Sequence, residues 1–100
     1  MKTIIQFVNM PTSETMEAYT IKKLERLHKV YDAIIALNVF FKKENDSKGK
    51  GNICEMEISI PGPRLFASSN EKNFELAVKN TISDLEKQLE KRKAIVKPYL

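Results

Sequence analysis

The chain has 100 residues, a net charge of +4, and 42% hydrophobic and 30% charged residues. This length is enough for one domain with a real core, and we expect a single domain over residues 1–100. No apolar run approaches the roughly 18 residues of a membrane-spanning helix, so we expect no membrane partner. The single cysteine, Cys54, excludes an internal disulfide and favours a reducing compartment, the cytoplasm.

The positive charge is concentrated in two segments of the chain. Residues 22–50 carry eight basic and four acidic side chains, and residues 86–100 carry five and two. The segments 1–21 and 51–85 are net acidic, by one and two charges. Such segregation is typical of proteins that bind a polyanion such as RNA. Solvated lysines that complement the negative end of a helix explain the pattern equally well.

The first two predicted elements are a strand and a helix. Residues 2–8 form a strand with Ile5 and Phe7 on one side. Thr12 or Ser13 then caps a helix that runs to about Tyr31. The polar surface of this helix carries a group of basic residues: Lys22, Lys23, Arg26 and Lys29. Cations along one helix edge can follow RNA phosphates, and a solvated surface explains them about equally well.

Three strands are predicted between this helix and the next. The strand 34–43 has four alternating apolar residues on its inner face: Ile35, Leu37, Val39 and Phe41. Residues 44–52 are polar and Gly-rich, which predicts a hairpin loop. Residues 53–60 alternate cleanly between apolar and polar, which is typical of an antiparallel strand with one buried face. After a turn at Pro61 and Gly62, residues 64–68 form a short returning strand.

The last third of the chain, residues 69–100, is predicted to be one long amphipathic helix. Ser68 or Ser69 can cap its start, with Glu71 completing a capping box. Apolar residues recur at helical spacing: Phe74, Val78, Ile82, Leu85 and Leu89. Its far end is basic and carries Lys87, Lys91, Arg92, Lys93 and Lys97. These cations lie around the helix, so we expect its last turns to project from the body.

The element order is therefore β-α-β-β-β-α. One amphipathic sheet and two amphipathic helices predict an α+β two-layer sandwich, in which both helices pack on one face of a four-stranded sheet. The other face of the sheet is then open.

The sequence offers no constellation for catalysis. Its one histidine, His28, lies on a helix flank, where packing or solvent exposure is the commoner role. No Cys/His cluster has metal-ligand spacing, and no phosphate-binding Gly-rich loop or activated nucleophile is present. We expect no enzyme, no metal, no cofactor and no small-molecule substrate.

Four stretches of the sequence are each common on their own, but their order and spacing along the chain are characteristic when taken together. They are the helix from SETM to YDAI (residues 13–34), VFFK (39–42), LFAS (65–68) and ISDLEKQLEKRK (82–93). Together they resemble the bacterial ribosome hibernation-promoting factor family, also called ribosome-associated inhibitors or sigma-54 modulation proteins. The chain departs from the family at residues 73–79 (NFELAVK), where members often have an acidic and tyrosine-containing opening to the last helix.

The resemblance implies a function. Members bind the small ribosomal subunit in the channel used by mRNA and tRNA, and they silence idle ribosomes in stationary phase or under stress. It implies contacts with ribosomal RNA at Lys23, Arg26, Lys42, Lys87, Lys91, Lys93 and Lys97, and the helical spacing adds Lys22, Lys29 and Arg92. The end at Leu100 implies a short form, monomeric off the ribosome, without the C-terminal domain through which long forms dimerise.

Two other functions remain open at this stage. A general double-stranded RNA-binding domain would have a related α+β arrangement and would bind naked duplex as well as ribosomes. A protein-interaction module would use the open sheet face, where Ile53, Glu55, Glu57 and Ser59 are too acidic to meet phosphates.

Overall fold

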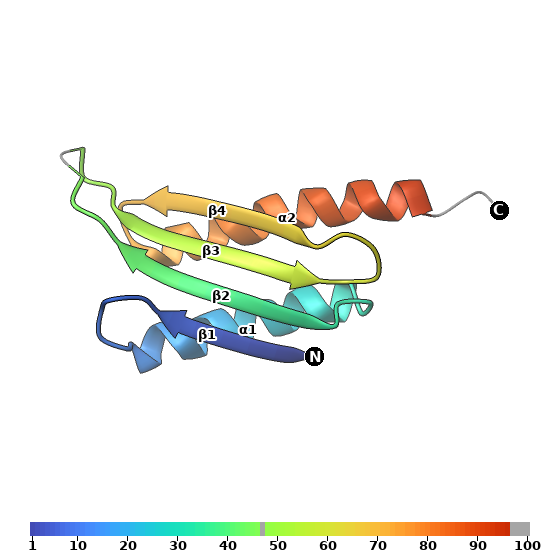
Figure 1. Cartoon of the computed structure of the whole chain (residues 1–100), viewed down its shortest axis with the longest axis horizontal. Coiled ribbons are helices and arrows are strands. Elements are labelled where there is room, and N and C mark those ends of the chain that lie inside the picture. The colour runs from blue at the N-terminus through green and yellow to red at the C-terminus, as the bar shows by residue number, and fades with distance from the viewer. Residues whose placement is uncertain (47, 97–100) are drawn as a thin grey trace.

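The computed structural model describes residues 1–46 and 48–96, and it confirms the predicted element order. The elements are β1 (Lys2–Phe7), α1 (Glu14–Val30), β2 (Ala36–Lys43), β3 (Asn52–Ser59), β4 (Leu65–Glu71) and α2 (Phe74–Val96). The strands lie in the order β1-β2-β3-β4, with β1 parallel to β2 and the other neighbours antiparallel. Figure 1 shows both helices on the same side of this sheet, which confirms the two-layer α+β sandwich.

The core lies between the sheet and the helices. Every second residue of β2 and β3 is buried there, because successive side chains of a strand point to opposite faces. The helices contribute their own apolar faces: Leu24 and Leu27 from α1, and Val78, Leu85 and Leu89 from α2. Phe41 joins three elements, since its ring stacks on Phe7 at 4.9 Å and meets the edge of Phe74 at 5.3 Å.

Helix α1 begins where the sequence predicts. The Ser13 hydroxyl accepts a hydrogen bond from the Met16 N–H at 3.2 Å, which satisfies one of the unpaired donors of the first turn. Glu14 and Glu17 lie in that turn, where their charge opposes the helix dipole. The helix ends at Val30, close to the predicted end, and is capped by Tyr31, whose N–H donates to the Leu27 carbonyl.

Helix α2 begins later than predicted. Ser68 and Ser69 belong to β4, which stays paired with β3 as far as Glu71 opposite Asn52. The Asn73 side-chain oxygen accepts from the Leu76 N–H at 2.8 Å, so Asn73 is the cap. The predicted capping box is therefore wrong, because strand pairing engages the backbone of both serines and the helix starts only beyond it.

The start of β2 also differs from the prediction. Ile35 was expected in the core, but its side chain is 60% exposed, and Ile34 is buried instead. The Ile34 N–H donates to the Tyr31 carbonyl in the turn that leaves α1, and the strand begins only at Ala36. Strand alternation therefore governs which residues are buried only from Ala36 onward.

The two helices run side by side in the same direction (Figure 1). The Tyr31 hydroxyl, at the end of α1, donates a hydrogen bond to the Glu90 carboxylate of α2. Beyond this point α2 extends past the turn between β3 and β4, as predicted (Figure 1). The basic second halves of both helices consequently lie at the same end of the molecule.

Candidate nucleic-acid interface

Most of the predicted RNA-binding residues lie in the helix layer. Eight of them lie on the two helices: Lys22, Lys23, Arg26 and Lys29 on α1, and Lys87, Lys91, Arg92 and Lys93 on α2. Lys42 lies on β2. Lys97 lies outside the described residues.

The four cations of α1 point in two directions. Lys23 and Arg26 line a groove between the two helices. Lys22 and Lys29 are exposed and share one stripe of the helix, because they are seven residues apart. At about 100° per residue, this stripe lies roughly a quarter turn from the middle of the groove lining. The Lys23 ammonium lies 5.5 Å from the centre of the Tyr19 ring, a cation–π contact that restrains it beside the groove.

The groove between α1 and α2 has a volume of about 290 Å³ and a mixed lining. Its apolar lining consists of Leu27, Val30 and Ile82, and its charged lining of Lys23, Arg26, Lys79 and Glu86. The sequence-based prediction missed Lys79. A signal was present, since Lys79, Ile82 and Glu86 follow the i, i+3, i+7 spacing of one helix face.

The cations at the end of α2 diverge. Lys87 and Lys91 are one turn apart and form an exposed stripe on one side of the helix. Lys93 is exposed on the groove side, since the fourteen residues from Lys79 make nearly four complete turns. Arg92 turns toward the sheet, where its guanidinium donates to the Pro61 carbonyl at 3.4 Å. The structure therefore gathers the helix cations at one end of the molecule without placing them on one stripe.

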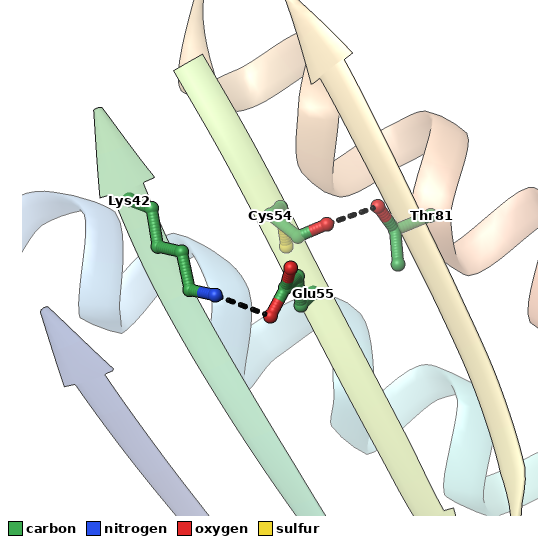
Figure 2. A network of polar contacts seen from close by, with 4 residues as sticks. All are labelled: Lys42, Cys54, Glu55 and Thr81. Atoms are coloured by element: carbon green, nitrogen blue, oxygen red, sulfur yellow. Dashed lines mark hydrogen bonds and ion pairs between the residues drawn. The ribbon is translucent and has the colours of Figure 1, made fainter. Parts of the chain in front are cut away.

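Lys42 lies on the opposite side of the molecule, on the open face of the sheet. Its ammonium is 3.0 Å from the Glu55 carboxylate, an ion pair shown in Figure 2. Arg64 makes a similar pair with Glu57 at 3.3 Å. Lys42 and Arg64 are thus each partly neutralised by a carboxylate of β3, which weakens their attraction for phosphate.

Two titratable side chains have raised pKa values, and neither provides a nucleophile. The hydrogen bond to Glu90 raises the pKa of the Tyr31 phenol to about 12, with burial and the negative charges of Glu90 and Glu86 adding to the effect. Burial raises the pKa of the Cys54 thiol to about 12, so this thiol is protonated at neutral pH. The adjoining Thr81 hydroxyl lies 3.2 Å from the Cys54 carbonyl oxygen (Figure 2), a link between α2 and β3.

The described part of the chain offers neither a metal-binding cluster nor a membrane-spanning helix. Residues 1–46 and 48–96 hold no group of three or more His, Cys, Asp or Glu side chains arranged to bind a metal ion. None of the helices described in these ranges is both long enough and apolar enough to cross a membrane.

Comparison with known proteins gives a family match and a number of similar solved structures. A family model described as sigma 54 modulation protein / S30EA ribosomal protein matches residues 3–97. A ribosomal subunit interface protein from Coxiella burnetii has a TM-score of 0.81 and 26% identity, covering 94% of this chain and 99% of that one. The N-terminal domain of Protein Y from Thermus thermophilus has a TM-score of 0.78 over 91% of this chain and 98% of that one; at 20% identity it shows the fold alone. A search of curated protein sequences found no match.

Proposed function

From the premise that this chain belongs to the sigma 54 modulation protein / S30EA ribosomal protein family, we propose that it binds the ribosome and holds it inactive. The similar Coxiella burnetii structure is that of a ribosomal subunit interface protein, which supports a ribosomal partner. The proposed site is the mRNA and tRNA channel of the small subunit. Occupation of that channel would block translation in idle or stressed cells, and a ribosomal partner places the protein in the cytoplasm.

One observation carries the proposal: the helix layer presents cations that are not paired with carboxylates. Among the described residues, ion pairs join Lys42 to Glu55 and Arg64 to Glu57, and both lie on the open sheet face. No ion pair in that part of the chain involves a cation of α1 or α2. The helix layer is therefore the side of the molecule on which most of the basic side chains remain available to neutralise phosphates.

The proposed mechanism is steric occlusion held in place by electrostatics. Lysine and arginine side chains neutralise phosphates of folded ribosomal RNA and release the counterions condensed on them. Structured RNA is recognised largely through its shape and backbone, so the domain needs no base-reading motif in order to bind. We assign the main contacts to the helix cations that lie outside ion pairs: Lys22, Lys23, Arg26, Lys29, Lys79, Lys87, Lys91 and Lys93. Arg92 is assigned to the edge of the interface, whereas Lys42 on the other face is assigned at most a minor contact; Lys97 stays a prediction from the resemblance. Off the ribosome the protein is proposed to be a monomer.

The open sheet face favours a second candidate, a protein-interaction module. Phe66 is 55% exposed on β4, opposite Glu57 of the Arg64–Glu57 ion pair, and Ile4 is 40% exposed on β1 at the other edge of this face. Apolar groups rimmed by charges are typical of protein contacts. Such a module would not depend on the helix cations.

Co-sedimentation with purified small subunits, across a salt series and with competing duplex RNA, tests these functions. We expect binding that resists the competitor, weakens steeply with salt, and is lost when Lys91→Glu and Lys93→Glu are combined. Binding that the duplex removes would indicate a general double-stranded RNA-binding domain. Failure to sediment at low salt would contradict the ribosomal function and favour the protein-interaction module.

A further inference from the structure

We propose that the groove between α1 and α2 binds one unpaired nucleotide of RNA, with its base against the apolar lining and its phosphate on the surrounding cations. This inference rests on the proposed function, because it assumes that the partner of the helix layer is RNA. It goes beyond phosphate contact, since it assigns to the groove a preference among bases.

The apolar lining is the first argument for a base. Val30 is 66% exposed, the largest exposed fraction among the large hydrophobic side chains of the described residues, and it lines the groove. Leu27 is buried beneath it, and Ile82 is half-buried on the facing helix. A surface that only follows phosphates gains nothing from exposed aliphatic groups, whereas a base removes them from water when it packs on them.

The cations around the groove fit the rest of a nucleotide. Lys23 and Arg26 approach from α1 and Lys79 from α2, so a phosphate beside the groove meets positive charge from both helices. The cation–π contact with Tyr19 restrains Lys23. The planar guanidinium of Arg26 can also stack on the plane of a base, which an ammonium cannot do.

The carboxylate of Glu86 decides which base is preferred. It is the one acidic group in the lining, and it makes neither an ion pair nor a hydrogen bond with any other described residue. A carboxylate beside phosphate-binding cations repels the phosphate, but it accepts a hydrogen bond from the amino group of a base such as cytosine. Uracil is also a pyrimidine, but it has a carbonyl oxygen where cytosine has the amino group. The carboxylate repels this oxygen. The groove should therefore prefer bases with an amino group.

Methyl NMR of the full chain can test this with three probes: cytidine 5′-monophosphate, uridine 5′-monophosphate and ribose 5-phosphate. We expect both nucleotides to shift the methyl signals of Leu27, Val30 and Ile82, and ribose 5-phosphate to leave them nearly unchanged. Because one hydrogen bond to a charged group distinguishes the two nucleotides, the cytidine nucleotide should bind at least about threefold more tightly. Glu86→Gln should remove this difference, because an amide can donate or accept, and the exposed Glu75→Gln on the same helix should preserve it.

Three results would overturn the inference. They are equal methyl shifts with all three probes, equal affinity for the two nucleotides in the unchanged protein, and a preference that survives Glu86→Gln. Small-subunit co-sedimentation of the same Glu86→Gln variant separates this failure from that of the proposed function. Binding to the subunit without nucleotide-dependent methyl shifts would exclude the base site and leave the ribosomal function standing.

Discussion

On the open face of the sheet, two cations lie beside carboxylates, whereas most cations of the helix layer face solvent or a shared groove. Lys42 and Arg64 are 3.0 Å and 3.3 Å from Glu55 and Glu57. The groove between the helices brings three cations together with the single carboxylate of Glu86. Both regions contain basic residues, so counting charges along the chain does not distinguish them. The two regions differ instead in whether each cation lies beside a carboxylate, because a paired cation attracts phosphate less than an unpaired one.

The two regions also differ in how much of the fold depends on them. The side of the sheet that faces the helices carries the core, and the open side carries residues that stay partly in water. Substitutions on the two sides should consequently have different effects on stability and on binding. Four predictions test this contrast, in order of decreasing effect.

The largest effect is expected from the buried side of the sheet. Ile58 is fully buried, and Ile58→Ala should lower the free energy of unfolding by about 2–5 kcal/mol, since it removes apolar contacts and leaves a cavity. Phe66→Ala on the open face should cost less than about 1 kcal/mol, because its side chain is already 55% exposed. Urea denaturation of both variants measures the difference. Equal losses would mean that the Phe66 side chain is buried in solution, which would contradict an open sheet face.

The next effect concerns ribosome binding and uses two variants that each remove two positive charges. Lys23→Gln with Arg26→Gln should weaken small-subunit binding about tenfold or more and lower the slope of log affinity against log salt by roughly 1–2. Lys42→Gln with Arg64→Gln should change the affinity less than about twofold, because those cations are paired on the other face. Salt-dependent co-sedimentation measures both quantities. If the variant with Lys42→Gln and Arg64→Gln weakened binding more, the interface would have to be assigned to the open sheet face instead.

A smaller effect is expected at the start of α2. Asn73→Ala should lower the free energy of unfolding by about 1 kcal/mol, since the Leu76 N–H loses its cap. Ser68→Ala, on the exposed side of β4, should change it by no more than about 0.5 kcal/mol. Thermal unfolding of both variants provides the test. The reverse ranking would restore Ser68 as the cap that the sequence suggested.

The smallest effect concerns the hydrogen bond between Tyr31 and Glu90. The folded pKa of this phenol is raised from 10.0 to about 12, so the folded state holds the proton more tightly than the unfolded state. Its contribution to stability is therefore complete below pH 10 and is lost as the pH rises from 10 to 12. Ultraviolet titration of tyrosine should show Glu90→Gln moving this pKa toward 10, and Glu57→Gln on the sheet face leaving it unchanged. An unshifted pKa in Glu90→Gln would contradict the contact between the helices.

The buried side of each main element could be predicted from sequence because it depends on local periodicity. The alternation in residues 53–60 correctly placed Met56 and Ile58 in the core, and the helical repeat placed Leu85 and Leu89 there. Ile35 was assigned wrongly, since the turn after α1 interrupts the alternation before β2 begins. The cap of α2 was assigned wrongly because two serines with good capping chemistry are held in a strand by β3.

The candidate site was predictable in its residue types but not in its grouping. The sequence identified Lys23 and Arg26 as basic residues on a helix, together with Lys22 and Lys29, but it could not tell which of the four would line a groove with α2. Lys79 was missed because it lies in a net acidic segment of the chain, outside the basic end of the last helix. Only the packing of α2 beside α1 brings it to the groove that Lys23 and Arg26 line.

By itself, the sequence determined the element types, their order and the apolar face of each, because these follow from repeats of two or about 3.6 residues that neighbouring positions encode. The tertiary structure alone decided which charges meet. Lys42 lies beside Glu55 because of the register between β2 and β3, and Lys23 shares a groove with Lys79 because two helices, remote in the chain, pack side by side. Such contacts join segments that no local repeat relates, so the division between a neutralised sheet face and a cationic helix layer emerges only on folding.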